Sequence, residues 1–447
     1  MSIPGVDQPA QPQARVVRAD RQQVLLKATD LEQLVPADHR ARGVWDFVQG
    51  LDLSAFYREI ESVEGRAGRP AIDPAILLTL WLYATVEGVG SARALAKLCE
   101  EHHAYQWICG GVSVEYRTLS DFRVKHVRKL DDLLTASVGA LLHAGVVKLR
   151  SVAQDGMRIR ASAGAASFRR HSTLNACLEE AEARVKALKQ QLEDDPGSTS
   201  RIEAAARQRA LEDRRRRVEA ALATATRLTS QDEKDDKNPP DNPASTADKP
   251  ELDAKKKRRE IRASTTDEEA RVMRFSDGGY RPGFNAQFST DVGSQIIVGV
   301  ELSNSGSDFG KLGPMLDQLH ARYGASPARA LVDGGFASRV EIESASTEHG
   351  CKVYAPTMPR RRPGPPAPSL KGDTPAVTRW RQRMQTERGK KIYKLRAATA
   401  ECVNALARNR GLRQFTVRGL ERARSVLLLF VLGHNALRIR SLAAATA

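Results

Sequence analysis

Apolar residues recur at helical spacing along the N-terminal third of the chain. The clearest stripe follows Asp73, a typical helix N-cap, and Pro74, which suits a first turn; it contains Ile76, Leu77, Leu80, Trp81, Tyr83 and Ala84. Residues 92–98 and 118–134 repeat the helical pattern. The sequence therefore predicts an N-terminal helical domain over residues 1–145.

A different helical pattern occupies the middle of the chain, where aromatic residues are scarce. Apolar positions there alternate in steps of four and three, the spacing of a coiled-coil seam, at Leu174, Leu178, Ala181, Val185, Leu188 and Leu192. A break at Pro196-Gly197-Ser198 precedes a second series, Leu211, Val218, Leu222 and Ala225. We expect an antiparallel helical hairpin, followed by a polar, charged linker over residues 231–249.

The remaining segments alternate between strand-like and helix-like patterns. Apolar runs predict strands at residues 146–159 and 328–333, another at 351–355, and a β-hairpin over 284–302 that turns near Gly293. Helical spacing covers residues 309–323, 393–409 and 420–440. Strands that alternate with helices predict an α/β fold, a mixed sheet with helices packed against it.

Composition narrows the class of protein. Of the 447 residues, 41% are hydrophobic, which is enough to bury a core and excludes wholesale disorder. Lys and Arg number 70 against 54 Asp and Glu, a net charge of +16 that favours a polyanionic partner. We expect no membrane span and no secretory signal. Five scattered cysteines without CxxC spacing indicate free thiols in a reducing cytoplasm.

Two aspartates are candidates for chemistry because each follows a strand-like run and precedes a glycine. They are Asp155, before Gly156, and Asp333, before Gly334. If the two strands are neighbours, the carboxylates lie close together and need a cation, for which Mg²⁺ is the expected ion. The alternative is that either Asp-Gly pair is an ordinary turn.

A third acid, Glu401, lies within the helical pattern of residues 393–409. On a helix it shares one face with Asn404, Ala405 and Arg408, at intervals of three, four and seven residues. An acid beside a cation on one helix face suits a magnesium site that touches a phosphate. The alternative is a surface glutamate among helix-forming residues.

Taken in order, the three acids resemble those of the DDE transposases of bacterial insertion sequences, in the branch with a Tyr-Arg-Glu signature around the third acid. Tyr393 and Arg396 have that signature's two-residue gap, and Glu401 and Arg408 have its six-residue gap. The interval from Arg396 to Glu401 is one residue longer than in the consensus. Further likeness lies at Gly68-Arg69-Pro70, Thr118 to Arg123, Phe284 to Gln287 and Asn409 to Asn435.

The resemblance implies an RNase H-like catalytic core, residues 146–171 and 263–447, with residues 172–262 as an inserted helical hairpin and basic linker. It implies Asp155 on the first strand, Asp333 on the fourth and Glu401 on a late helix. These three residues would be both catalytic residues and metal ligands, for two Mg²⁺ ions with Mn²⁺ able to substitute. Tyr393, Arg396 and Arg408 would orient the DNA phosphate.

The implied protein is a DNA transposase that binds the terminal inverted repeats of its mobile element and catalyses metal-dependent DNA cleavage and strand transfer. Its partners would be double-stranded DNA, at the element ends and the target, and a second copy of itself. We expect it in the bacterial cytoplasm, associated with the nucleoid and not with a membrane.

Basic side chains near the N-terminal helices are candidates for DNA contact: Arg69, Arg117, Arg123 and Lys125. Short helices joined by tight turns suit a helix-turn-helix-like module, but they also suit an ordinary packing domain. Basic runs at residues 214–217 and 255–259 are either phosphate contacts or solvated helix faces.

Other functions also fit parts of the sequence. A non-catalytic DNA-binding protein, such as a repressor or a decayed transposase, explains the charge and the N-terminal helices but not three ordered acids. A coiled-coil assembly protein or another RNase H-like nuclease are further alternatives. Among the remaining polar residues, we expect Asp291 at a hairpin turn, Asp308 as a helix cap and His434 in the core.

Overall fold

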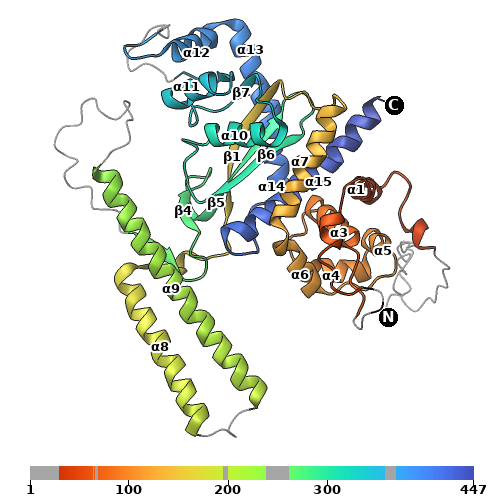
Figure 1. Cartoon of the computed structure of the whole chain (residues 1–447), viewed down its shortest axis with the longest axis vertical. Helices are drawn as coiled ribbons and strands as arrows, with labels where there is room; N and C mark the ends of the chain where they lie inside the picture. Colours follow the sequence, from red (N-terminus) through yellow and green to blue (C-terminus); the bar gives the residue numbers. More distant parts are fainter. Residues whose placement is uncertain are drawn as a thin grey trace, which may run out of the picture.

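A mixed β-sheet with helices on both sides forms the body of the protein (Figure 1). The computed structural model describes residues 30–63, 65, 69–194, 200–237, 261–357 and 369–446. The N-terminal helices lie to one side of the sheet, and a long helical hairpin extends away from its lower end in the view of Figure 1. The mixed α/β class predicted from the sequence is confirmed.

The N-terminal part is helical, as predicted. After the short turn η1 (Leu31–Leu34) come α1 (Arg40–Gln49), α2 (Ser54–Tyr57), α3 (Pro74–Val86), α4 (Ala92–Glu101), α5 (His103–Cys109), α6 (Tyr116–Lys125) and α7 (Val127–His143). Helix α3 begins as expected, because the Asp73 side chain accepts a hydrogen bond from the Ala75 N–H at 2.8 Å. The single helix predicted over residues 118–134 is two helices, since the backbone leaves helical geometry at His126.

The sheet contains β1 (Ser151–Arg160), β4 (Arg271–Arg274), β5 (Tyr280–Asp291), β6 (Ile297–Ser303), β7 (Arg329–Leu331) and β8 (Lys352–Tyr354). The strand order is β4-β5-β1-β7-β8, with β6 also paired to β5. Strands β1, β5 and β6 pair antiparallel, whereas β7 pairs parallel to both β1 and β8. Strand β1 therefore lies inside the sheet, between an antiparallel and a parallel neighbour.

Helices from the second half of the chain surround this sheet. They are α10 (Leu312–Tyr323), α11 (Arg339–Thr347), α12 (Pro375–Gln385), α13 (Glu387–Arg396), α14 (Cys402–Asn409) and α15 (Leu420–Thr446). A single π-helical turn, η4 (Ala397–Glu401), joins α13 to α14. This helical run packs on β1, β5, β7 and β8 through a small apolar cluster of Ala153, Leu331, Tyr354 and Ala400.

One continuous hydrophobic core joins the N-terminal helices to the sheet, and it does not divide at residue 145. Helix α15 connects the two, because it packs on α1, α3, α6, α7 and β6. Gly433 permits the close approach, since a Cβ there would lie 3.0 Å from the Leu82 carbonyl oxygen. By length and composition α15 could also cross a membrane, but much of it is buried in this core.

Two minor expectations are confirmed beside α15. His434 is a core residue: burial lowers its pKa to about 4, and its Nε2 lies 3.1 Å from the Gln295 carbonyl oxygen. Asp291 ends β5 at the hairpin turn, where its carboxylate accepts a hydrogen bond from the Ser294 N–H at 2.8 Å.

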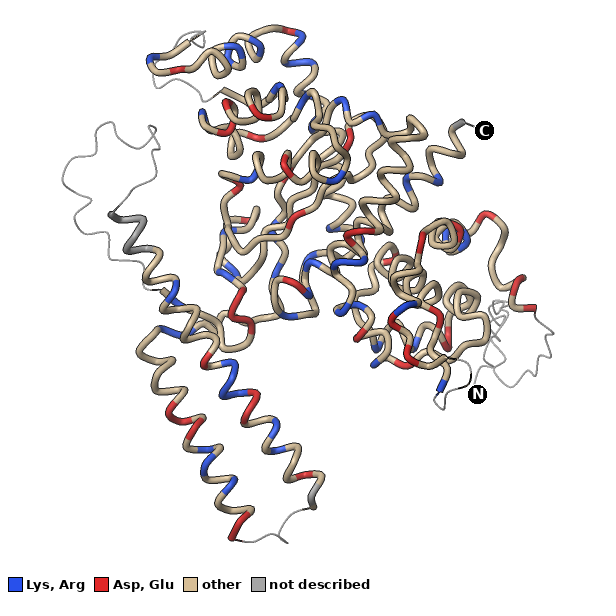
Figure 2. Tube along the Cα trace, in the orientation of Figure 1, with Lys and Arg blue, Asp and Glu red and all other residues tan. Residues whose placement is uncertain are grey.

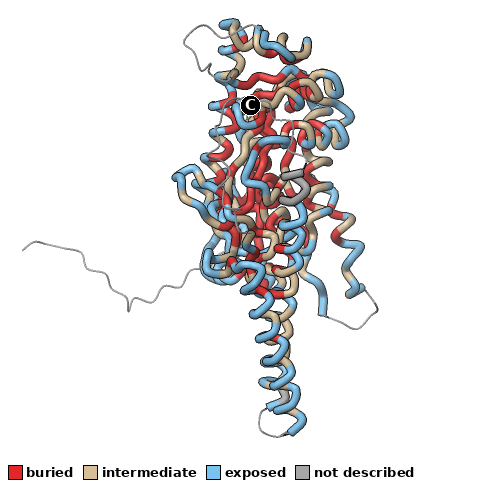
Figure 3. Tube along the Cα trace, turned by 90° about the vertical axis from the view of Figure 1, so that its left-hand side faces the viewer, coloured by how far each residue is buried: buried red, intermediate tan, exposed pale blue. Residues whose placement is uncertain are grey.

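The predicted helical hairpin consists of α8 (His171–Asp194) and α9 (Arg201–Lys237), which pack along each other. Its small core is separate from the main one and contains Leu174, Val218, Ala221, Ala225 and Ala263. Most of the hairpin is exposed, in contrast to the body (Figure 3). Helix α9 continues to Lys237, so the prediction of a linker from residue 231 is wrong over those seven positions. The break at residues 196–198, the rest of that linker and the basic run at 255–259 lie outside the described residues.

The hairpin is attached through a short two-stranded ladder. Strand β2 (Phe168–Arg170) pairs antiparallel with β3 (Arg262–Ser264), and the last pair, Arg170 with Arg262, stands at the hairpin's base. The two ends of the insertion are thus neighbours in space, as the ends of a β-hairpin loop are.

We therefore predict that residues 171–261 can be replaced by a two-residue Asn-Gly turn without unfolding the rest. Because the hairpin has its own core, the free energy of unfolding of the body should change by no more than about 1–2 kcal/mol. Circular dichroism and urea denaturation of the shortened chain measure this. Loss of cooperative unfolding would show that the hairpin is part of the main folding unit.

Candidate active site

Two of the three predicted acids lie near each other, Asp155 within β1 and Asp333 just beyond the end of its parallel neighbour β7. Ser151 pairs with Arg329 and Ala153 with Leu331, and continuing this register by two residues sets Asp155 beside Asp333. Asp155 lies within β1, which continues to Arg160, so the alternative of an Asp-Gly turn is wrong there. Asp333 follows β7 and does begin a turn: its Oδ1 accepts a hydrogen bond from the Gly335 N–H at 2.8 Å.

Both oxygens of Asp155 have donors. Oδ1 accepts from the Gly156 N–H at 3.0 Å and pairs with Arg396 Nη2 at 3.0 Å. Oδ2 accepts from Asn404 Nδ2 at 2.9 Å. The Asp155 side chain is only 16% exposed, so these partners replace most of its contact with water. The carboxylate therefore has a fixed position and orientation.

The third acid is joined to the first by one guanidinium. Arg396 Nη1 donates to Glu401 Oε1 at 2.7 Å, while Nη2 of the same group pairs with Asp155. Glu401 itself is 56% exposed at the surface of the helical run. Arg396 thus stands between a largely buried acid and an exposed one, and its charge is shared by the two.

The π-helical turn makes this contact possible. Five residues span about 1.4 turns of an α-helix, which would direct Arg396 and Glu401 to different sides. In a π turn the hydrogen bonds join residues five apart, so such residues lie on one face. The five-residue interval from Arg396 to Glu401 is accommodated in η4, where the Ala398 carbonyl also accepts from Gln295 Nε2 at 3.1 Å.

The pKa values of the site reflect both crowding and burial. Burial raises the pKa of Asp155, Arg396 opposes this, and the negative charges of Asp333 and Asp308 raise it further. Burial lowers the pKa of Arg396, but Asp155, Tyr393, Asp333 and Glu401 outweigh burial and leave it raised. Tyr393 has a raised pKa from burial, which Arg396 opposes and the three acids reinforce. The acids, Arg396 and Tyr393 therefore share one electrostatic neighbourhood.

The chemistry of the donors suits Mg²⁺ or Mn²⁺, because all three acids supply hard oxygen ligands. In the described parts of the chain, however, no group of three or more acidic, histidine or cysteine side chains is arranged closely enough to hold a metal ion. The reason lies in the contacts above: Asp155 and Glu401 are bound to Arg396, and Asp333 is turned toward its own loop. The residues fit the ion by type, with Arg396 supplying the positive charge between two of them.

Of the remaining predicted residues on this helical run, Tyr393 is half-buried against the sheet and Arg408 is exposed. Asn404, which was noted only as sharing a face with Glu401, proves to be a direct partner of Asp155. It is 3% exposed, and its Oδ1 has no hydrogen-bond partner among the described residues. Its three-residue spacing from Glu401 was the only signal in the sequence.

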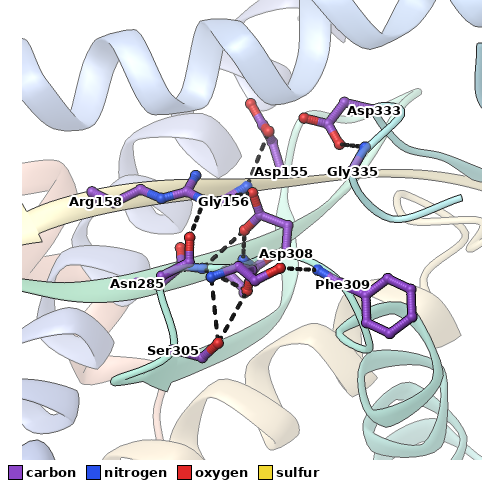
Figure 4. A network of polar contacts seen from close by, with 12 residues as sticks. Asp155, Gly156, Arg158, Asn285, Ser305, Asp308, Phe309, Asp333 and Gly335 are labelled. Carbon is purple, nitrogen blue, oxygen red and sulfur yellow. Dashed lines mark hydrogen bonds and ion pairs between the residues drawn. The ribbon is translucent and has the colours of Figure 1, made fainter. Parts of the chain in front are cut away.

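The structure corrects the prediction for Asp308. Lys311, not Asp308, is the N-cap of α10, and Asp308 is instead buried in a polar network with Arg158, Asn285 and Gln287. Figure 4 shows this network on the opposite side of β1 from Asp155 and Asp333. The available signal in the sequence was the pair of polar residues at alternate positions of β5, Asn285 and Gln287. Their partner Asp308 lies in the loop after β6, so the pattern alone did not identify it.

The basic residues predicted to contact DNA differ in their surroundings. Arg123 is buried: Nη1 donates to the Gly90 carbonyl and to Thr416 Oγ1, and the guanidinium stacks on Trp81. The prediction that Arg123 contacts DNA is therefore wrong, because its guanidinium is buried and contributes to the packing of α6 on α3. Lys125 pairs with Asp121 at 2.8 Å, Arg117 stacks on Tyr116, and Arg69 is exposed.

Comparison with known protein families places two matches on the chain. Residues 29–125 match a family described as "Transposase domain (DUF772)", and residues 369–440 match one described as "Transposase DDE domain". The two matches support an insertion-sequence DDE transposase. The second match includes Glu401 but neither Asp155 nor Asp333. Searches of curated proteins and of solved structures gave no significant match.

We predict that Arg396→Met lowers the free energy of unfolding of the protein by about 2–3 kcal/mol at pH 7, because it removes the cation paired with Asp155 in a buried site. Without Arg396 the pKa of Asp155 rises further, so the carboxyl binds a proton more readily in the folded state. The loss should therefore shrink as the pH falls through this raised pKa and Asp155 becomes neutral. Urea denaturation across pH 4–8 measures it.

Arg408→Met is the matched control for this prediction. Arg408 lies on the same helical run but is exposed, so its replacement should change the free energy of unfolding by no more than about 0.5 kcal/mol. Equal effects of the two substitutions, or a loss at Arg396 that does not depend on pH, would contradict the ion-pair assignment.

Proposed function

We propose that this protein is a DNA transposase that binds the terminal inverted repeats of its element and catalyses metal-dependent DNA cleavage and strand transfer. The observation that carries the proposal is the placement of Asp155 on β1 beside Asp333, which follows the parallel neighbour β7, with Glu401 linked to Asp155 through Arg396. Isolated acids in turns would have no reason to share one buried arginine.

The sheet supports an RNase H-like catalytic core. Its strands run in the order β6-β5-β1-β7-β8, three antiparallel followed by two parallel, with the Asp155 strand in the centre. Among these five, Asp155 lies on the first strand in chain order and Asp333 just after the fourth. We assign the core to residues 146–171 and 263–447, with residues 172–262 as an insertion and residues 1–145 as the helical DNA-binding part.

Asp155, Asp333 and Glu401 are the residues that would hold the divalent cations, two Mg²⁺ ions in our proposal, with Mn²⁺ able to substitute. Bound there, such ions supply activation of the attacking water or DNA 3′-hydroxyl and stabilisation of the leaving 3′-oxygen. Three carboxylates in one neighbourhood require positive charge, and the substrate brings only more negative charge.

Other residues of the chain bind and orient the catalytic carboxylates and the DNA phosphate. Asn404 and Gly156 hold the Asp155 carboxylate in one orientation. Arg396 keeps Glu401 close to Asp155, and Tyr393 and Arg408 are suited to hold the scissile phosphate beside the acids. No covalent protein–DNA intermediate is required, because the attacking group is a water or a DNA hydroxyl.

Outside the site, the proposed DNA surface is the basic side of the N-terminal helices. Arg93 and Arg117 both lie over the Tyr116 ring, at 5.1 and 5.9 Å from its centroid, and form an exposed cluster of two cations on one aromatic. Figure 2 shows further Lys and Arg positions along α9 and around the start of α15, with acidic positions among them. We propose a homodimer in the bacterial cytoplasm, since an element has two ends to cut.

A non-catalytic DNA-binding protein is the second candidate. The observation that favours it is that Arg396 occupies the space between Asp155 and Glu401, so the described acids form no metal cluster as they stand. Such a protein would bind the element ends without cutting them. Cleavage in the presence of Mg²⁺ separates the two functions.

The test uses DNA fragments from either side of the gene, with the purified protein and Mg²⁺. We expect nicking at the element ends, and a fall of at least about a thousandfold in Asp155→Asn, equal to about 4 kcal/mol of activation free energy. DNA affinity should stay within about twofold. Asp317→Asn, an exposed aspartate on α10, is the control and should cut at the parental rate. Parental cutting by Asp155→Asn would refute the assignment.

A salt titration tests the DNA surface separately. Arg117→Ala should reduce the dependence of log affinity on log salt concentration by about one unit, because one phosphate contact is lost. Arg123→Met should leave that slope unchanged and instead lower the free energy of unfolding by about 2 kcal/mol, since it removes buried hydrogen bonds. The opposite pattern would exchange the roles of the two arginines.

A further inference from the structure

The strongest unassigned feature of the molecule is the buried polar network behind the candidate active site (Figure 4). We propose that Asp308 is a positioning residue, which fixes the backbone at Gly156 and through it the orientation of the Asp155 carboxylate. The inference rests on the proposed function only in assigning the catalytic role to Asp155.

Asp308 is held by three side chains. Its Oδ1 accepts from Asn285 Nδ2 at 2.9 Å and from Gln287 Nε2 at 2.6 Å, and its Oδ2 pairs with Arg158 Nη2 at 2.9 Å. The Asp308 side chain is 9% exposed. Because a largely buried carboxylate with a full set of donors has little freedom, the loop that carries Asp308 is fastened to both strands of the β1–β5 pair.

The network and the acids lie on opposite faces of β1. In the β1–β5 register Gly156 is opposite Gln287 and Arg158 is opposite Asn285, so these four positions point to one face of the sheet. Asp155, which immediately precedes Gly156 in β1, points to the other face, because successive residues of a strand alternate. Asp308 therefore makes no hydrogen bond to Asp155 and can orient its carboxylate only through the strand.

Gly156 is the point of transmission. A Cβ on Gly156 would lie 2.2 Å from Asp308 Oδ1 and 2.6 Å from Gln287 Nε2, so the carboxylate occupies the space of the missing side chain. On the other side of the same residue, the Gly156 N–H donates to Asp155 Oδ1 at 3.0 Å. Gly156 is thus next to Asp308 on one face of β1, and its N–H orients the Asp155 carboxylate on the other.

The same loop also reaches the turn of the second acid. A Cβ on Gly335 would lie 3.9 Å from the Asp308 Cβ and 3.0 Å from Asp333 Oδ1. The pairing of β1 with β7 ends at Ala153, and in the described part of the chain β1 next pairs on that side at Arg160, which bridges to Gln414. Between these points Asp308 lies close to both Gly156 and Gly335 and links the backbone segments that carry the two acids.

The number of hydrogen-bond donors around position 308 requires an aspartate. Three donors point at Asp308, and an asparagine offers only one acceptor oxygen while its NH₂ would face Arg158 or the amides. Asp308→Asn should therefore loosen Gly156 although the shape is unchanged. The matched control is Asp291→Asn: Asp291 is also buried and accepts two hydrogen bonds from Ser294, but at the far end of β5.

The first measurement is hydrogen exchange at the Gly156 amide, which needs neither metal nor DNA. We expect Asp308→Asn to accelerate this exchange by at least about tenfold relative to Asp291→Asn, with urea denaturation used to correct for any difference in global stability. The second is the Mg²⁺ concentration for half-maximal cleavage, which should rise by about tenfold in Asp308→Asn and stay within about twofold in Asp291→Asn.

A double variant covers the case in which Asp308→Asn does not fold. Asn285→Asp with Asp308→Asn returns one carboxylate to the network, opposite Arg158 and beside the new amide, and should bring Gly156 exchange back to within about threefold of the parent. Exchange at Gly156 that is equal in the Asp308 and Asp291 variants, or an unchanged Mg²⁺ requirement, would overturn the proposal. Parental cleavage by Asp155→Asn would instead refute the proposed function and leave the exchange result standing.

Discussion

The mutual repulsion of carboxylates in a partly buried site is the constraint on which this structure depends. The register of β1 and β7 sets Asp155 beside Asp333, and the helical run α13–η4–α14 brings Glu401 to the same neighbourhood. Like charges at this depth are costly unless a cation is present, and Arg396 is the cation that the chain provides. The π turn, the burial of Arg396 and the contact with Asn404 all serve that arrangement.

Much of the fold follows from local patterns in the sequence. Short apolar runs identified β1, β5, β6, β7 and β8, because buried strands need continuous hydrophobic segments. The Asp73-Pro74 pair located the start of α3, and the coiled-coil seam located α8 and α9. The patterns gave no sign of β2, β3 and β4, which are only three or four residues long and contain no extended apolar run. The sharing of α15 between the N-terminal helices and the sheet was also not predictable, since it depends on tertiary packing.

For the site, the sequence supplied the residues but not their contacts. Asp155 and Asp333 are each followed by a glycine, yet Asp155 lies within a strand and Asp333 begins a turn. The difference arises because β5 pairs with β1 beyond residue 155, whereas β7 ends at Leu331. The role of Arg396 depends on a π turn, which has no distinct sequence pattern. The local sequence around Asp308 permits a helix cap, whereas its actual partners are on β1 and β5.

Exposure and contacts also indicate which acid would have to move if a divalent ion took the place of the guanidinium, as in the proposed function. A guanidinium holds two carboxylates at 3.0 and 2.7 Å from separate nitrogens, whereas Mg²⁺ requires oxygens at about 2.0–2.1 Å from one centre. Asp155 is restrained by Gly156 and Asn404 as well as by Arg396, and only 16% of its side chain is exposed. Glu401 is 56% exposed, and its only partner among the described residues is Arg396. In the proposed site Glu401 would therefore be the ligand with freedom to move, and Asp155 would be the fixed point to which the ion and the other two acids are fitted.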